Sequence, residues 1–186
     1  SMNIGLSTLV DFLTQYAPSP KDRGAVPAKD LRGKKEIIVA PEPTGQPALF
    51  VFKTVSEQHV GELSYFRVYS GSITAGMDML NESNGKSERL GQLFLMNGKD
   101  RKEVGKLTAG DIGAVVKLKD THTNNTLSNK TFPVEFQPIV FPDPVIRMAI
   151  ISKSKGDEDR MATGLHYLHE EDPTFVMQVD SQLSQT

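Results

Sequence analysis

The clearest hydrophobic pattern lies between residues 48 and 135, where short apolar segments alternate with polar turns. Residues 48–55 form an apolar run, and residues 62–70 alternate strictly between two sets of side chains. The first set is Leu63, Tyr65, Arg67 and Tyr69, and the second is Ser64, Phe66, Val68 and Ser70. Alternation with a period of two is typical of a strand that turns one face to a core and the other outward.

Turn signals separate further strands in the same region. Asn84-Gly85 lies between the segments 77–82 and 86–96 and predicts a tight hairpin. A second turn at residues 97–100 precedes a strand at 101–107. Short strands at a spacing of about eight to twelve residues, without a helical window, are typical of a closed barrel or a sandwich. The sequence therefore predicts a mainly β fold.

The stretch from Ala109 to Leu127 combines a strand with a polar loop. Ile112–Leu118 is apolar and β-branched in the middle, without helical periodicity, which predicts a strand buried on both faces. The residues that follow are rich in threonine and asparagine, whose side chains bond neighbouring backbone groups and fix a turn.

The chain before residue 48 has two different patterns. Leu6, Leu9, Val10 and Leu13 recur at helical spacing, so residues 1–17 are expected to form a short helix, with Ser7 as its N-cap. Residues 18–47 hold several prolines between charged residues and glycines, which predicts an extended connector and not a core element. Within it, residues 37–39 have the composition of a short edge strand.

The chain after residue 141 changes pattern again. Residues 145–151 and 174–179 read as strands, and a helix capped by Asp157 is predicted between them. A β-α-β unit of this size is half of a ferredoxin-like α+β domain. Residues 142–186 are therefore expected to be a truncated domain.

Composition excludes several classes of protein. The 186 residues carry a formal net charge of -2, which excludes a broadly basic nucleic-acid binder, and zero Cys excludes disulfides and thiol catalysis and fits the cytoplasm. No apolar run approaches the roughly 20 residues of a membrane span, so no membrane partner is expected, and the chain is expected to be monomeric.

Residues with catalytic or metal-binding chemistry are sparse. No phosphate-binding G-x-x-x-x-G-K-[ST] loop is present, so the chain itself is expected to bind no GTP and to catalyse nothing. His166 and His169 lack a third metal ligand, and a solvated helix face explains them better. The acidic cluster Glu170-Glu171-Asp172 ends the predicted helix, where a solvated face is again favoured over pairing with basic or intramolecular partners.

Basic residues on the predicted strands and hairpins are the main candidates for binding. Arginine and lysine next to aromatic side chains on a barrel suit the phosphates of RNA, whereas ordinary solubility charge is the alternative. The candidate RNA-binding residues are Arg67, Lys86, Arg89, Lys99 and Arg101. No catalytic, cofactor-binding or metal-binding residue is assigned.

Four blocks of sequence resemble the elongation factor G family of ribosomal translocation GTPases. They are the stretch from Ala109 to Leu127, Gly61–Gly71, Phe141–Ile146 and Glu170–Phe175. The resemblance implies a translation-factor-type β-barrel as second domain at residues 48–141 and the first half of the third domain at 142–186. It also implies that residues 1–17 are the last helix of a GTPase domain that this sequence lacks, and that Phe141, Pro142 and Pro144 form an interdomain hinge.

The resemblance also implies a function. The barrel of such a factor docks on small-subunit ribosomal RNA and proteins and braces its own GTPase domain during GTP-dependent movement of tRNA and mRNA. GTP and Mg would belong to the parent protein and not to this part of it. A stand-alone RNA- or protein-binding barrel is the alternative from another class.

Departures from the family pattern bear on which relative the parent protein is. The stretches Met96–Val104 and Val116–Lys119 look more like the paralogous elongation factor G-like branch than the main translocase, which usually has a glycine before its Leu-Lys. Asn124-Asn125 stands where the family usually shows Gly-Asp. The alternatives for the parent are the housekeeping translocase, a specialised substitute and a ribosome-protection relative.

Overall fold

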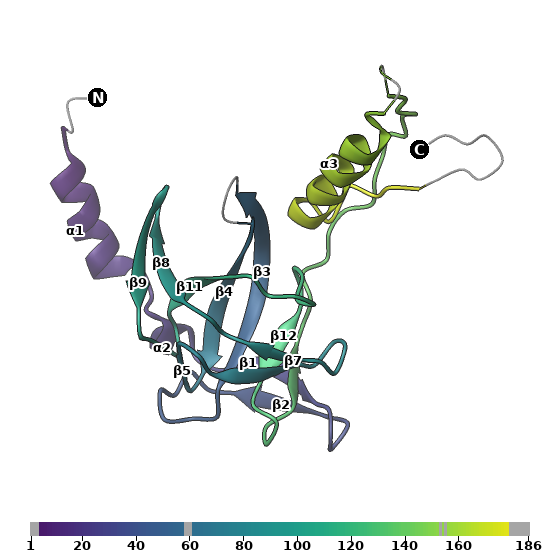
Figure 1. Ribbon diagram of the computed structural model, residues 1–186. Coiled ribbons are helices and arrows are strands. Elements are labelled where there is room, and N and C mark those ends of the chain that lie inside the picture. Colours follow the sequence, from purple (N-terminus) through teal and green to yellow (C-terminus); the bar gives the residue numbers. More distant parts are fainter. Residues whose placement is uncertain (1–3, 58–60, 153, 155, 179–186) are drawn as a thin grey trace.

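The computed structural model describes residues 4–57, 61–152, 154 and 156–178 and contains strands in the middle with helices toward both ends (Figure 1). The helices are α1 (Leu6–Tyr16), α2 (Pro20–Arg23) and α3 (Glu158–Glu171). The strands are β1 (Val26–Asp30), β2 (Lys35–Val39), β3 (Ala48–Glu57), β4 (Gly61–Ser70), β5 (Ser72–Thr74), β6 (Asp78–Asn81), β7 (Ser87–Arg89), β8 (Leu93–Asn97), β9 (Asp100–Val104), β10 (Lys106–Thr108), β11 (Ile112–Val116), β12 (Thr126–Ser128) and β13 (Val134–Phe136). The predicted mainly β fold is confirmed.

The largest sheet has eight strands in the order β7-β6-β12-β3-β4-β11-β8-β9, and all its neighbours are antiparallel. It curls around one core as a β-barrel (Figure 1). Strands β5 and β10 pair in a separate two-stranded sheet. The long β3–β4 pair contains register shifts at Ala48/Leu49 and Val51/Lys53. Such bulges bend a strand, which helps a sheet to curl.

The inner core is made by the alternate side chains that the sequence pattern selects. On β4, Ser64, Phe66, Val68 and Ser70 are buried, whereas the intervening side chains face outward. This confirms the predicted alternation over residues 64–70, whereas Leu63, predicted on the same face as Tyr65, is fully buried. The inner core consists of Leu49, Val51, Phe66, Val68, Ile73, Met79, Leu90, Leu93, Leu107, Val115, Leu118 and Leu127.

Strand β11 is buried on both faces only in its middle. Gly113 faces inward, where an added Cβ would lie 2.3 Å from Leu107 Cδ1 and 3.1 Å from Phe66 Cζ. Ile112 is 52% exposed because it faces outward, where no second layer of the described residues covers it. The expectation of burial on both faces is therefore wrong for Ile112.

The segment 18–47 contributes a hairpin and a core, which contradicts its interpretation as an extended connector. Strands β1 and β2 join β13 in a three-stranded sheet that packs on the outer side of the barrel. Pro27 is tolerated because it pairs only with β2 and lies beyond the β1–β13 ladder. The outer core consists of Ala28, Val39, Ala48, Phe50, Val134 and Phe136, with Tyr69 packed against it. Strand β2 is an edge strand, as predicted.

Both predicted hairpins form, but the first differs in detail. Gly85 has φ +73, and its N–H donates to the Asn81 carbonyl over 2.8 Å, so the turn is wider than two residues. The strand expected over 86–96 is divided into β7 and β8 by residues 90–92, since Leu90 turns into the inner core. The second hairpin turns at Gly98 and Lys99, between the paired Asn97 and Asp100.

The segment after the barrel forms its helix but neither of its predicted strands among the described residues. α3 runs from Glu158 to Glu171, whereas residues 145–151 and 174–178 have no regular structure. Val145 is 94% exposed and Met148 is 82% exposed. A strand needs a neighbour for its backbone groups, and no strand of the described chain pairs with these residues. Residue 179 lies outside the described part.

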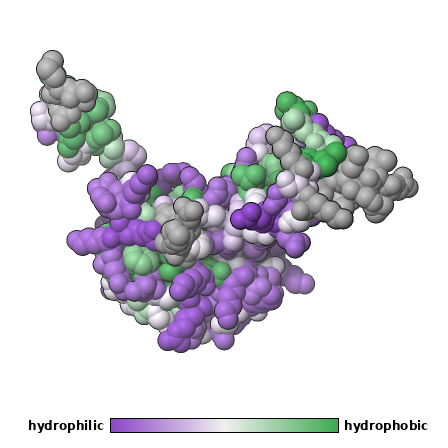
Figure 2. All heavy atoms as spheres, turned by 45° about the horizontal axis from the view of Figure 1, so that its top comes forward, coloured by the Kyte–Doolittle hydropathy of each residue, from purple (hydrophilic) through white to green (hydrophobic). Residues whose placement is uncertain are grey.

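Helix α1 projects from the barrel and none of its residues is buried (Figures 1 and 2). It begins after Gly5 at the N-cap, so Ser7 lies inside the helix and the predicted N-cap is wrong. Its apolar side chains form a green patch in Figure 2, and Phe12 is 56% exposed. An isolated helix of this length is marginal in water, so α1 has the composition of a helix that docks on another surface.

Candidate functional site

Arg67 and Arg101 lie on one outward face of the barrel. Ala114 on β11 pairs with Tyr65 on β4 and with Phe94 on β8, and Arg101 pairs with Met96 two residues further along β8. Because alternate residues share a face, these side chains all point away from the inner core. We call this set the outer arginine face, and it consists of Tyr65, Arg67, Phe94, Met96, Arg101, Glu103 and Ile112.

The outer arginine face combines guanidinium groups with partly exposed aromatic rings. The Arg67 guanidinium carbon lies 5.8 Å from the centroid of the Tyr69 ring, and Tyr65 and Phe94 are half-buried. Exposed aromatic rings stack with bases or pack on a protein surface, and arginine pairs with phosphates. The face is therefore suited to binding a macromolecule.

Two of the predicted basic residues are engaged by carboxylates of the barrel itself. Lys86 Nζ pairs with Asp120 Oδ1, and Arg89 Nη1 lies 3.8 Å from Asp78 Oδ1. Both pairs are exposed, so each lysine or arginine still reaches solvent. Lys86 and Arg89 belong to the β6–β7 hairpin, whereas Lys99 is at the tip of the β8–β9 hairpin. The structure therefore does not gather the five residues on a single hairpin.

The polar loop of residues 117–125, which we call the signature loop, is held by a buried carboxylate. Glu88 on β7 is 5% exposed. Its carboxylate accepts hydrogen bonds from Lys119 N at 3.2 Å, from Asp120 N at 2.6 Å and from Thr121 Oγ1 at 3.0 Å. Sequence reasoning missed Glu88, since one glutamate in a polar strand gives no signal of burial.

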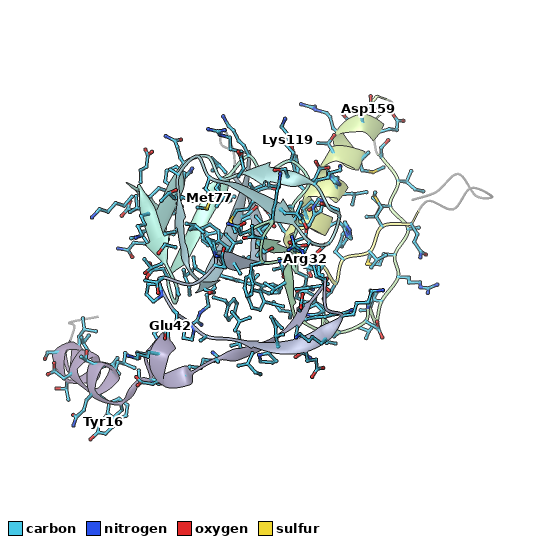
Figure 3. All side chains as sticks on the ribbon, turned by 90° about the horizontal axis from the view of Figure 1, so that it is seen from below. Tyr16, Arg32, Glu42, Met77, Lys119 and Asp159 are labelled. Carbon is cyan, nitrogen blue, oxygen red and sulfur yellow. The ribbon has the colours of Figure 1, made fainter. Side chains whose placement is uncertain are left out.

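A second buried group secures the same loop from the neighbouring strand. Asn81 is fully buried, and its Nδ2 lies 3.0 Å from Asp120 O and 2.9 Å from Asn125 Oδ1. The loop also joins β3, where Asn124 N donates to Val51 O over 2.8 Å. Figure 3 labels Lys119 of this loop, on the side of the barrel toward α3. The signature loop is thus anchored to β3, β6 and β7, as the threonine- and asparagine-rich sequence predicts for a fixed turn.

The signature loop also touches the segment that follows the barrel. Asn124 exchanges two hydrogen bonds with the backbone of Ile139, and His122 Nδ1 lies 2.6 Å from Glu170 Oε2 on α3. Glu171 Oε1 accepts from Ser56 N over 2.6 Å. The interpretation of the 170–172 acidic cluster as a solvated face is therefore wrong for Glu170, whose side chain is largely covered, whereas Glu171 is exposed and also pairs within the chain.

The predicted hinge residues follow directly after these contacts. Phe141, Pro142 and Pro144 lie in a segment without regular structure, and Pro142 and Pro144 are exposed. The structure puts them between the barrel and α3 in the chain, and the hinge remains a prediction.

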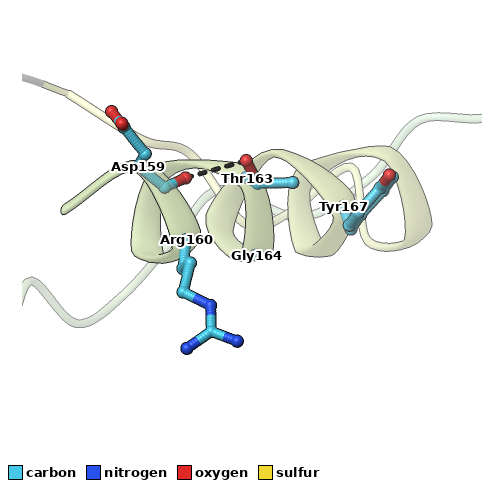
Figure 4. A pocket seen from close by; sticks show the side chains of 5 residues that line it. All are labelled: Asp159, Arg160, Thr163, Gly164 and Tyr167. Atoms are coloured by element: carbon cyan, nitrogen blue, oxygen red, sulfur yellow. Dashed lines mark hydrogen bonds between the residues drawn. The ribbon is translucent and has the colours of Figure 1, made fainter. Parts of the chain in front are cut away.

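One shallow hollow lies on α3 and is lined by Asp159, Arg160, Thr163, Gly164 and Tyr167 (Figure 4). Thr163 Oγ1 donates back to the Asp159 carbonyl over 2.8 Å. All its lining side chains come from a single helix, so no nucleophile with an adjacent base is assembled there.

The histidines of α3 do not assemble a metal site in the described part of the chain. His169 Nδ1 lies 2.6 Å from Phe175 O, just past the end of the helix. No group of three or more histidine, aspartate or glutamate side chains that could hold a metal ion occurs among the described residues.

The described helices are too short or too polar to span a membrane.

Two family models match consecutive parts of the chain. The model for Elongation factor G domain 2 matches residues 46–130, and the model for Elongation Factor G, domain III matches residues 141–186. The chain belongs to the elongation factor G family. Both matched domains are non-catalytic parts of elongation factor G proteins, so the chain is part of a translation elongation factor-like protein.

A solved structure has a similar fold along nearly the whole of this chain. A crystal structure of a protein from Thermus thermophilus matches 97% of this chain with a TM-score of 0.73 and 25% sequence identity. The match covers 25% of the Thermus chain, so our chain spans about a quarter of the length of that relative.

Proposed function

We propose that this chain is the non-catalytic middle part of an elongation factor G-like GTPase that promotes ribosomal translocation of tRNA and mRNA. In this proposal the barrel docks on RNA and proteins of the small ribosomal subunit. The observation that carries the proposal is the outer arginine face, where Arg67 and Arg101 flank partly exposed aromatic and aliphatic side chains. GTP and Mg would be bound by the GTPase domain of the parent protein, which works in the cytoplasm.

We also propose that the parent's own GTPase domain covers part of this chain. The exposed apolar stripe of α1 supports this. Leu9, Phe12 and Leu13 are each more than half exposed. Burying such side chains is favourable by about 1.5–3 kcal/mol each, so an uncovered stripe favours an apolar partner. A GTPase domain that precedes α1 in the parent would supply that surface.

The five candidate RNA contacts are expected to contribute unequally. Lys99 stands at a hairpin tip, and Arg67 and Arg101 share the outer arginine face, so these three are expected to contribute most. Lys86 and Arg89 belong to the β6–β7 hairpin and not to that face, so they are expected to contribute less. Lys86 also stabilises the signature loop through Asp120.

The test is the salt dependence of ribosome binding by the full-length parent protein. Each lysine or arginine that touches a phosphate releases counterions, so its change to alanine lowers the slope of log K against log salt by about one unit. We expect this for Arg67→Ala, Lys99→Ala and Arg101→Ala, and a smaller change for Lys86→Ala and Arg89→Ala. Lys34→Ala, an exposed lysine on the β1–β2 turn, is the matched control.

Measurements on the full-length parent protein test ribosome docking and GTP hydrolysis separately. If all five variants bind ribosomes with the affinity and slope of the control, the docking surface lies elsewhere on the factor. Ribosome-dependent GTP hydrolysis by the parent protein tests the GTPase part of the proposal separately. Tight binding of GTP by the chain alone, measured by calorimetry, would contradict its non-catalytic role.

A further inference from the structure

The segment that follows the barrel has little apolar packing to hold it in place. Residues 137–140 are exposed, and Ile139 is 41% exposed. On α3, Leu165 is the one buried residue. Polar contacts with the barrel therefore carry a larger share of the attachment than they would across an extensive apolar interface.

Asn124 provides the first contact, and its backbone shows why an asparagine suits this position. Its φ is +74, a conformation that favours glycine and that asparagine adopts more readily than other residues. Its Nδ2 donates to Ile139 O over 3.0 Å, and its Oδ1 accepts from Ile139 N over 2.8 Å. Glycine would satisfy the same backbone without either bond. The side chain thus pairs with the exposed linker as a neighbouring strand would.

His122 provides the second contact, with a carboxylate that is buried. The side chain of Glu170 is 9% exposed, and its Oε2 lies 2.6 Å from His122 Nδ1. A buried carboxylate without a hydrogen-bonding partner is costly, so loss of the histidine would favour movement of the helix end into solvent. Asn124 and His122 both belong to the signature loop, which Glu88 and Asn81 fix on the barrel.

We infer that the signature loop is a latch, in which Asn124 and His122 hold the third-domain segment in one orientation on the barrel. The latch is separate from the outer arginine face and does not depend on RNA binding. Its two contacts act on different parts of the segment. Asn124 bonds to the backbone of Ile139, and His122 pairs with Glu170 at the end of α3. Releasing either contact shifts the population toward orientations in which α3 leaves β3.

The full chain permits a direct measurement because it contains zero Cys. Lys102→Cys on β9 and Ala162→Cys on α3, both at exposed positions, would carry spin labels for a distance distribution by pulsed electron resonance. The labelled parent chain is expected to give one narrow distribution. Asn124→Gly keeps the backbone conformation accessible and removes only the side-chain bonds, and it should broaden the distribution and add a second distance. His122→Ala should do the same.

Two controls separate a latch from general loosening. His166→Ala changes a histidine on α3 that faces solvent, and Asn97→Gly changes an exposed asparagine of the β8–β9 hairpin. Both variants should keep the distance distribution of the parent chain. Circular dichroism melting of each variant verifies that the barrel remains folded. The latch is overturned if Asn124→Gly and His122→Ala, with folded barrels, keep the parent distribution. It is overturned equally if the two controls broaden that distribution to the same extent.

Discussion

The barrel and the segment after residue 141 both contain runs of apolar and β-branched residues, but only the barrel buries them. Phe66 and Leu127 of the barrel are fully buried, whereas Val145 and Ile146 of the segment are 94% and 75% exposed. The barrel strands have hydrogen-bonded neighbours, and residues 145–151 have none in the described chain. The difference shows that an apolar run becomes a strand only where a second strand completes its ladder.

The largest expected effect compares a core residue from each region. Phe66→Ala removes a ring at the centre of the inner core and should lower the free energy of barrel unfolding by about 3–5 kcal/mol. Leu165→Ala, at the buried position of α3, should leave the barrel transition unchanged. Denaturant unfolding followed by circular dichroism measures both variants. Equal losses would mean that the two regions unfold as one unit.

A second change acts on the loop that joins the two regions. Glu88→Ala leaves the buried donor of Thr121 and the partly buried donors of Lys119 and Asp120 without their acceptor, and should cost about 2–3 kcal/mol of barrel stability. Glu36→Ala, at an exposed site on β2, is the control and should change little. Hydrogen exchange at Asp120 N should rise in Glu88→Ala. Unchanged protection there would show that Glu88 does not hold the loop.

A smaller effect is expected from two glycines with the same backbone requirement. Gly85 in the barrel has φ +73 and Gly156 in the segment has φ +99, and an added Cβ would meet no atom within 4 Å at either. Alanine in such a conformation costs about 1–2 kcal/mol. Gly85→Ala should therefore lower the barrel melting temperature, and Gly156→Ala should not. A similar melting temperature for Gly85→Ala and the parent chain would show that the turn does not require a glycine at position 85.

The smallest effect concerns acid stability. Burial raises the pKa of the half-buried Glu82 carboxyl above its ordinary value of 4.5, against the opposing hydrogen bond from Ser128. Between the unfolded and folded pKa values the native state holds more protons, so this group lowers stability as pH rises through that window. Glu82→Gln removes the penalty, and its gain over the parent chain should be larger at pH 7 than at pH 4.

The matched change in the segment is Asp172→Asn. Hydrogen bonds from Thr174 lower the pKa of that exposed carboxyl, but it lies outside the barrel. Asp172→Asn should leave the barrel transition where it is at both pH values. A gain for Glu82→Gln that is the same at pH 4 and pH 7 would show that burial of Glu82 does not govern the difference.

Local patterns made much of the barrel predictable from the sequence. The alternation along residues 62–70 identifies the buried face of β4, and the glycines at 85 and 98 mark both hairpins. The β1–β2 hairpin was not predictable, since Pro27 is typical of a connector and its place beyond the β13 ladder depends on tertiary pairing. The strands after residue 141 were predicted from propensity, which does not supply a partner strand.

The candidate site was less predictable because its contacts join distant residues. Arg67 and Arg101 were selected for charge, but their common face follows from the β4-β11-β8-β9 order. The partner of Lys86 is Asp120, and the partner of His122 is Glu170, at separations that no periodicity relates. Asn124 was noted only as a departure from the family pattern. Its positive φ and its bonds to Ile139 became visible with the structure.

Strand β3 contributes to both cores, with Leu49 and Val51 in the inner one and Phe50 in the outer one. This has a practical consequence for the solubility of shortened chains. A chain that began at residue 46, where the match to the domain 2 model starts, would lack β1 and β2. It would expose Phe50, Tyr69 and Phe136 as an adhesive aromatic surface prone to self-association. The smallest soluble barrel is therefore expected to begin at or before Val26.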